Sequence, residues 1–314
     1  MKPVRILLTV VMMISLAGIA EADIIVKSKI VTDIMGAGKT EMSHANYIKP
    51  DRSCGESSTK FTGGLMAMMG AGKEKKSIDI TRLDKAVMWM LNPEKKSYRE
   101  TSFETLKKAY AAQSKGRPGQ NPMAAGTDPE QYTWAIDVAE MKETGKVGGY
   151  TCKGMAAKAT GVNKEDPEDK VVVTYKQWYS DKFPGYSTYK AYEDNFGKQL
   201  GSQQFGEQRR LATMLSMFGD KLDVLMDKMN EIEGMPMKSS MLVERTKGPY
   251  EMDEQAGEEE VDSMRAKMRE IMGKPEKTES GMYKIFSIES EVLSVEESQI
   301  DGSKFSIPEG YTAQ

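Results

Sequence analysis

Two short glycine-lysine runs are the residues of this sequence that could hold a phosphate group. They lie at 36–40 (GAGKT) and 70–73 (GAGK). A phosphate-binding loop of the Walker type needs a further glycine five residues before the Gly-Lys pair, so that backbone N–H groups can surround the phosphate. Asp33 and Ala67 occupy those positions. We therefore expect glycine turns between strands and no nucleotide site.

His44 is the only histidine in the sequence, so a Ser-His or Cys-His pair would have to use it. The residues around it read as a strand, and no nucleophile elbow lies near it. The carboxylates at 258–260, Glu289 and Glu291 are typical of solvated faces, whereas a glycosidase needs two separated acids at one site. We expect a surface or edge-strand histidine and a protein that is not an enzyme.

Methionine is over-represented, with 25 residues in the chain. Three groups place thioethers two residues apart, at 66–69, 88–90 and 235–237. Soft sulfur ligands select Cu(I), so one hypothesis is a metal-handling protein. The other is that methionine, which is flexible and polarizable, fills an irregular core or lines an adaptable surface. We favour the second because no histidine or cysteine joins the groups, and we expect no metal ion and no cofactor.

The two cysteines, Cys54 and Cys152, are candidates for a disulfide if the protein works in an oxidising compartment. Two separately buried thiols are the alternative, because sequence does not show whether the geometry of a bridge is met. Both outcomes fit the sequence.

The first residues have the plan of an export signal. Lys2 and Arg5 precede an almost wholly apolar stretch at 6–20, and Ala20 and Ala22 are small residues around a cleavage point. The stretch is shorter than the ~20 residues of a spanning helix, and no later stretch is longer. No cysteine follows it directly to accept a lipid anchor. We expect a cleavable signal peptide at 1–22 and a periplasmic or secreted protein with no membrane span.

The charge balance argues against nucleic acid as a partner. The formal net charge is −3, and removing Lys2, Arg5 and Glu21 takes away a net +1 to leave −4. Nucleic acids favour a concentrated basic face. The sequence leaves the oligomeric state open.

Strands dominate the predicted secondary structure. Residues 24–34 alternate between apolar and polar side chains, the period-two pattern of a half-buried strand. The same extended character returns at 41–48, 77–82, 86–91, 96–100, 132–138, 148–157, 171–179, 238–246 and 283–295. Strand and helix do not alternate regularly, so the sheet should be mostly antiparallel.

Three helices are predicted. A short one begins at Thr101, where Thr101 and Glu104 have capping-box spacing. Residues 211–232 repeat apolar side chains at intervals of four and three, and residues 253–272 form an acidic helix. The helix at 211–232 could pair with another helix, but we favour an arrangement in which it lies across the sheet.

Five short motifs are spread over the chain after residue 22. They lie at 88–92 (MWMLN), 145–152 (GKVGGYTC), 234–237 (GMPM), 286–295 (FSIESEVLSV) and 305–311 (FSIPEGY). Together they resemble an uncharacterised exported bacterial family, that of domain of unknown function 4412. That family is similar in layout to the LolA-like periplasmic lipoprotein carriers, in which a curved antiparallel sheet wraps around helices and encloses an apolar cavity. The resemblance implies a fold more than a function.

We therefore expect an α+β fold of the LolA-like half-barrel type, with a curved, mostly antiparallel β-sheet wrapped around amphipathic helices. Residues 23–314 would form a single domain with a helical insert at about 185–275. The methionine content departs from the family pattern, so the cavity could be filled rather than open.

The leading hypothesis is a non-enzymatic binding protein of the cell envelope. Its sheet-helix groove would take a lipid, an acyl chain or a hydrophobic partner segment. The residues expected to line the groove are Met88, Trp89, Met90, Phe218, Leu222 and Met226. The alternatives are Cu(I) binding by the methionine groups and a structural role in which the long helices contact protein partners.

Overall fold

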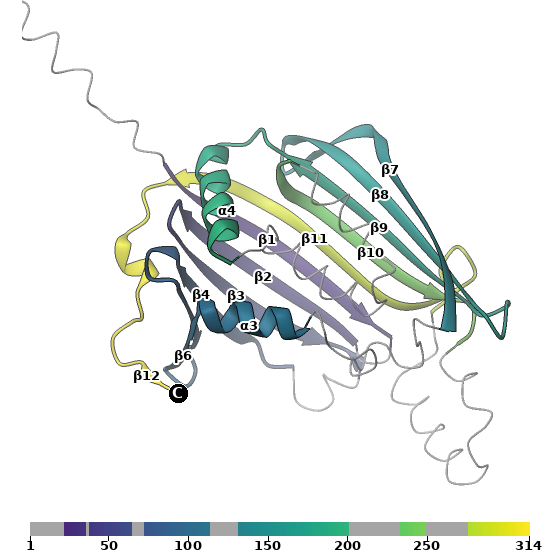
Figure 1. Ribbon diagram of the computed structural model, residues 1–314, viewed down its shortest axis with the longest axis horizontal. Helices are drawn as coiled ribbons and strands as arrows, with labels where there is room; N and C mark the ends of the chain where they lie inside the picture. The colour runs from purple at the N-terminus through teal and green to yellow at the C-terminus, as the bar shows by residue number, and fades with distance from the viewer. Residues whose placement is uncertain (1–21, 36–37, 65–71, 114–130, 201–232, 249–275) are drawn as a thin grey trace, which may run out of the picture.

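Strands make up most of the protein in the computed structural model, which describes residues 22–35, 38–64, 72–113, 131–200, 233–248 and 276–314. Within these residues twelve strands form one sheet (Figure 1). In chain order they are β1 (Asp23–Ile34), β2 (Gly38–Lys49), β3 (Arg52–Thr62), β4 (Lys75–Arg82), β5 (Val87–Asn92), β6 (Ser97–Ser102), β7 (Tyr132–Val147), β8 (Tyr150–Asn163), β9 (Lys170–Ser180), β10 (Met235–Arg245), β11 (Tyr283–Ser298) and β12 (Thr312–Ala313). The helices of the described residues are α3 (Phe103–Gln113), α4 (Tyr186–Leu200) and the 3-10 turns η3 (Leu83–Lys85) and η7 (Gly302–Phe305).

The strand order is β12-β6-β5-β4-β3-β2-β1-β11-β10-β9-β8-β7, so the sheet is open. Neighbouring strands are antiparallel, except that the short β12 runs parallel to β6. The predicted mostly antiparallel sheet is confirmed. β1 pairs with β11 along its whole length, and this pairing joins the strands of the first hundred residues to those that follow.

The two faces of the sheet differ in chemistry, as β11 shows. Phe286 and Val292 are buried on one face, whereas Glu289 and Glu291 are exposed on the other. Successive side chains of a strand point to opposite faces, so this alternation assigns an apolar and a polar side. We call the face on which α4 packs the inner face and the opposite one the outer face.

The core of the inner face consists of two groups of buried side chains. The first lies on β7 to β11 and contains Tyr132, Met155, Ala157, Ala159, Val171, Val173, Tyr175, Met241, Val243 and Phe286. The second lies nearer α3 and α4 and contains Ile24, Val26, Ile48, Leu83, Phe103, Val147, Cys152, Phe183, Tyr192, Phe196, Leu200, Met235, Met237, Val292 and Val295. Both groups include residues of β10 and β11, so the apolar surface continues from one to the other.

Charged side chains cross-link the strands on the outer face. Lys27 of β1 pairs with Glu296 of β11 at 3.1 Å, and Lys238 of β10 pairs with Glu291 at 3.6 Å. These pairs are about half exposed and each stabilises the fold little. Their charges favour exposure of the outer face to solvent. The apolar inner face is therefore the side of the sheet that favours burial.

The C-terminal tail covers part of the outer face. Phe305 is fully buried against Cys54, Ile80 and Trp89 of strands β3 to β5. The guanidinium of Arg82 donates a hydrogen bond to the Phe305 carbonyl at 3.2 Å. After this anchor the chain reaches β6, where β12 pairs with the sheet edge.

Helix α4 lies on the inner face over β1 and β2 (Figure 1). The hydroxyl of Tyr192 is 2.7 Å from Ser53 Oγ, and Thr188 donates to the Ala22 carbonyl at 2.8 Å. Helix α3 contacts α4 through an edge-to-face pair of Phe103 and Phe196. No helix among the described residues is long and apolar enough to cross a membrane.

The predicted strands and helices can be compared with those of the structure. The strands predicted at 24–34, 77–82, 171–179 and 283–295 are confirmed, as is a helix that follows Thr101. Strand β3 was not predicted, and helix α4 was predicted only as part of the helical insert at about 185–275. The signal segment at 1–21 and the helices predicted at 211–232 and 253–272 lie outside the described residues.

We predict that Phe305→Ala will lower the free energy of unfolding by about 3–5 kcal/mol, because it removes a fully buried ring and leaves a cavity. Urea denaturation followed by circular dichroism measures the change. Leu293→Ala is the matched control, because Leu293 is 58% exposed and should cost less than about 0.5 kcal/mol. An equal effect of the two substitutions would show that the tail does not anchor the outer face.

Candidate functional site

The inner face of β7 to β11 is the candidate functional site, because its cluster of buried apolar side chains contains no residue of α3 or α4. Helix α4 contacts β1, β2 and η3, whereas α3 contacts α4 and β6. Figure 1 shows that both helices lie on the β1 to β6 side of the sheet and that β7 to β10 extend beyond them.

The register of the strands builds this surface from matched apolar pairs. Met241 of β10 faces Tyr175 of β9, and Val243 faces Val173. Small residues follow on β8, where Gly161 lies beneath Trp134 of β7. A Cβ at Gly161 would lie 2.9 Å from the Trp134 ring, so the indole needs the glycine to lie across β8. Methionine and small residues together give an apolar surface of adaptable shape.

The structure divides the predicted lining residues of β5 between the two faces. Met88 pairs with Thr81 and Met90 with Asp79, which places both thioethers on the inner face. Trp89 lies on the outer face, in the cluster beneath the C-terminal tail. Its indole N–H donates to Glu100 at 2.7 Å. Period-two alternation separates three consecutive strand residues in this way, so Trp89 does not share a surface with its neighbours.

The other predicted lining residues, Phe218, Leu222 and Met226, lie outside the described residues. Among the methionine groups, Met235 and Met237 are buried in the inner-face core. The described residues contain no group of three or more His, Cys, Asp or Glu side chains that could hold a metal ion.

Cys54 and Cys152 are free, buried thiols in the structure, which is the alternative to the candidate disulfide. Cys54 lies on β3 in the outer-face cluster, whereas Cys152 lies on β8 in the inner-face cluster. Strands β2, β1, β11, β10 and β9 separate β3 from β8 in the sheet order. A disulfide needs Cα atoms within about 7 Å, a distance that five intervening strands exceed. Burial raises the pKa of Cys54 to about 12, so its thiol is unreactive.

His44 was predicted to be a surface or edge-strand histidine; it is half-buried on β2, which lies between β1 and β3 and not at an edge of the sheet. Its Nδ1 is 2.8 Å from Ser57 Oγ. A Cβ on Gly55 would lie 2.8 Å from the His44 ring, so the absence of a side chain there accommodates the imidazole. The backbone N–H groups around Ser57 pair with neighbouring strands and cannot converge on an oxyanion, so this pair lacks the electrostatic part of an acyl-transfer site.

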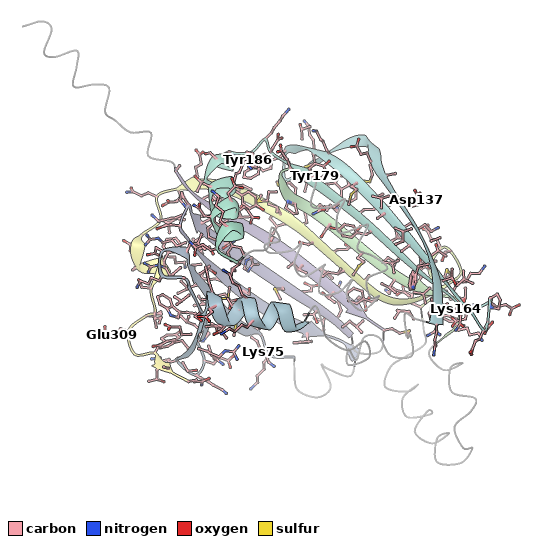
Figure 2. The ribbon with its side chains drawn as sticks, in the orientation of Figure 1. Lys75, Asp137, Lys164, Tyr179, Tyr186 and Glu309 are labelled. Carbon is pink, nitrogen blue, oxygen red and sulfur yellow. The ribbon has the colours of Figure 1, made fainter. Side chains whose placement is uncertain are left out.

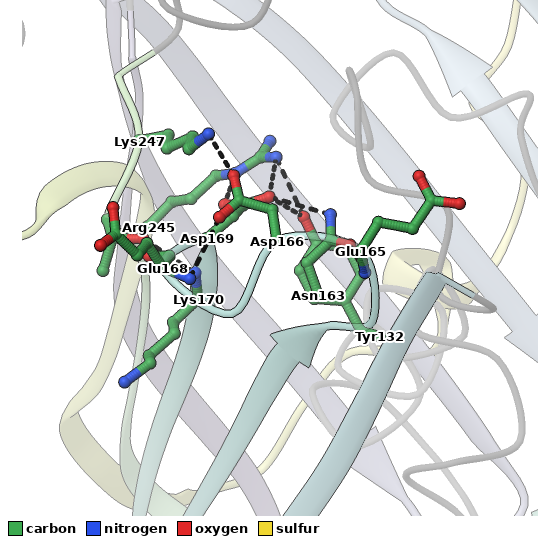
Figure 3. Close-up of polar contacts among 10 residues, drawn as sticks. Tyr132, Asn163, Glu165, Asp166, Glu168, Asp169, Lys170, Arg245 and Lys247 are labelled. Atoms are coloured by element: carbon green, nitrogen blue, oxygen red, sulfur yellow. Dashed lines mark hydrogen bonds and ion pairs between the residues drawn. The ribbon is translucent and has the colours of Figure 1, made fainter.

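A buried polar cluster closes one end of the candidate surface (Figure 3). Arg245 at the end of β10 donates to both carboxylate oxygens of Asp169, at 2.8 and 2.7 Å. Tyr132 at the start of β7 donates to Asp169 at 2.7 Å, and Asn163 of β8 donates to it at 3.3 Å. Each partner comes from a different strand, so the cluster fixes the ends of β7, β8 and β10 around the β8–β9 turn.

Hydrogen bonding dominates the electrostatics of this cluster. Burial alone would raise the pKa of Asp169, but the hydrogen bonds from Arg245 and Tyr132 outweigh it and lower the pKa to about 2. Burial and the hydrogen bond to Asp169 raise the pKa of Tyr132 to about 12. Asp169 is therefore ionised and Tyr132 neutral at pH 7. All three groups are occupied with one another, so the cluster is a structural support of the surface and not a reactive site.

The residues of this cluster were not predicted, because they lie far apart in the sequence and belong to no short motif. Their one local signal is an acidic turn, Asp166 to Asp169, directly before a strand. Helix α4 had a stronger signal, which would have given its bounds within the insert predicted at about 185–275. Its buried residues Thr188, Tyr192, Phe196 and Leu200 repeat every four positions.

No protein-family model and no curated protein matches this chain. The chain is similar to the crystal structure of a LolA superfamily protein from Nitrosomonas europaea, with 8% sequence identity over 91% of this chain and 91% of that one. The TM-score is 0.24. At that value the likeness carries no argument about what this chain binds, and the function has to come from the geometry described above.

We predict that Asp169→Asn will lower the free energy of unfolding at pH 7 by about 3–5 kcal/mol, because it leaves Arg245 buried without its charged partner. The pKa of Asp169 is lower in the folded protein, so its stabilising effect is present above about pH 4 and is lost as the pH falls towards about 2. The difference between wild type and variant should therefore shrink over that range, as measured by urea denaturation.

The matched control is Asp166→Asn, in the same turn. Asp166 forms an exposed ion pair with Lys247, which should be worth less than about 1 kcal/mol. An Asp169→Asn variant as stable as Asp166→Asn would contradict the structural role of the cluster.

Proposed function

We propose that this protein is a non-enzymatic binding protein that takes an apolar ligand, a lipid or acyl chain, or a hydrophobic partner segment, on the inner face of its sheet. The observation that carries the proposal is the apolar inner face of β7 to β11, whose cluster of buried side chains around Tyr175 and Met241 contains no residue of α3 or α4. A surface of this kind favours an apolar ligand because burial contributes roughly 25 cal/mol per Å² of apolar area.

The chemistry of the surface supports a ligand without strong directional bonds. Met155 and Met241 have flexible side chains, and Ala157 and Ala159 have small ones. The charged outer face remains in solvent, which keeps the two sides of the sheet distinct. Work in the cell envelope, after removal of residues 1–22, and membership in the family of domain of unknown function 4412 are parts of this proposal that rest on the sequence.

Cuprous ion binding is less favoured by the contacts of the described methionines. The sulfur of Met90 accepts a hydrogen bond from the Arg99 guanidinium at 3.8 Å. A cation beside the thioether opposes the binding of a second cation. Met235 and Met237 fill the core and pack against apolar side chains.

We predict that the purified protein binds 1-decanol and that Ile288→Glu weakens this binding at least about tenfold, because a carboxylate on the inner face would have to be desolvated by the ligand. Isothermal titration calorimetry measures the affinity. Ile288 is half-buried against the inner-face cluster.

Leu293→Glu is the control on the same strand, because Leu293 is exposed to solvent. It should leave the affinity for 1-decanol unchanged. Wild-type protein that takes up no 1-decanol, or equal affinities of the two variants, would contradict the inner face as the binding surface.

A further inference from the structure

A cluster of aromatic rings lies beside the inner face where α4 begins. Phe183 makes edge-to-face contacts with Tyr186 at 5.4 Å and with Tyr189 at 6.0 Å between ring centroids. The rings of Tyr186 and Tyr189 stack at 6.5 Å. Figure 2 shows Tyr186 at this end of the molecule. Both tyrosines are half-buried and pack against the inner-face core, so their rings border the apolar surface.

Glu193 continues the same side of α4. Residues 186, 189 and 193 are spaced by three and four, which places them on one stripe of a helix. The Oε1 atom of Glu193 is shielded from solvent and accepts no hydrogen bond from a described residue. Tyr189 forms a hydrogen bond with the carboxyl group. A buried acceptor without a donor is destabilising, so a ligand that brings a hydrogen-bond donor to this oxygen would be favoured.

The charges around this stripe favour a positive ligand group. Asp181, Glu233 and Asp194 act on Tyr186, and Lys190 is the one opposing charge among the described groups that do so. Lys190 also pairs with Asp194 at 3.6 Å on the solvent side of the helix. Aromatic faces attract cations, and a combination of rings with a carboxylate is typical of sites that recognise ammonium groups.

We propose that Glu193, with the rings of Tyr186 and Tyr189, binds the primary ammonium group of an amphiphile whose alkyl chain lies on the inner face. This inference rests on the proposed function, because it names the head group of the apolar ligand proposed there. The ammonium group would donate to Glu193 Oε1 and lie against the aromatic cluster. Burial and the nearby Asp194 raise the pKa of Glu193 to about 8, so the carboxyl group is largely protonated when no cation is bound.

Binding of the ammonium group therefore releases a proton from Glu193. The affinity for the ammonium group should rise between pH 6 and pH 9. At the higher pH Glu193 is already a carboxylate, so binding no longer has to displace its proton. The groups that could add to this dependence are Tyr189, Lys190 and Asp194 on α4, and Asp181 and Glu233 beside Tyr186. Of these, Lys190 and Asp194 form their own exposed pair, which supplies the control.

The test compares decylammonium chloride with 1-decanol by isothermal titration calorimetry at pH 6 and pH 9. At pH 9 wild type should bind decylammonium about tenfold more tightly than 1-decanol, because a charge-assisted hydrogen bond is worth about 1.5–3 kcal/mol. Glu193→Gln should remove this preference and its pH dependence while it leaves the affinity for 1-decanol unchanged. Asp194→Asn should keep the preference at pH 9 and shift its pH dependence to lower pH, because the charge of Asp194 raises the pKa of Glu193.

The outcomes separate this inference from the proposed function. If 1-decanol binds and decylammonium shows no preference at pH 9, or if Glu193→Gln keeps the preference, the ammonium site is wrong and the apolar surface stands. The same loss in Asp194→Asn would also overturn the site. If neither ligand binds wild type, the proposed function fails. Glutamine has the shape of the protonated acid, and the pH profile of wild type gives a second readout that needs no variant.

Discussion

The pairing of β1 with β11 is the interaction on which the rest of the structure depends. It joins Asp23 to Ser298 and continues to Ile34 and Phe286, between segments that lie at opposite ends of the chain. A shift in this ladder at Lys27 and Ser28 sets which residues of β11 face inward. Because side chains alternate along a strand, a slip of one residue would turn Val292 and Phe286 out to solvent. The apolar inner face is continuous across both halves of the sheet because this register holds.

The difference between the two faces also determines which segments pack on each face of the sheet. On the outer face, ion pairs between strands suit contact with water, and the tail at Phe305 protects the apolar part over β3 to β5. On the inner face, α4 is seated by Tyr192 and Thr188 over β1 and β2. The Asp169 and Arg245 pair holds the strand ends of the other half. The structure thus supports a broad apolar surface at both ends, and the described helices lie over one half of it.

The sequence predicted the strands that alternate clearly and missed those that do not. β1 and β11 have a visible period of two. β3 contains serine, glycine, glutamate and lysine, because two of its inner-face serines form hydrogen bonds with His44 and Tyr192. Helix α4 fell within the predicted insert at about 185–275 but received no bounds of its own, because its tyrosines resemble strand residues. Alternation along the predicted strand at 86–91 already separates Met88 from Trp89, but which of the two lies on the inner face depends on the register with β4. The sequence left the disulfide between Cys54 and Cys152 open for the same reason, because strand order is not readable from spacing.

The central claim is that the inner face holds an apolar ligand. Native mass spectrometry of the protein, purified without detergent from the cells that produce it, tests this claim most directly. The account predicts a second mass above that of the protein alone, which organic solvent removes and added lipid restores. A single mass, with no uptake of lipid or of an apolar probe, would contradict the account and leave the sheet as a surface that the chain itself fills.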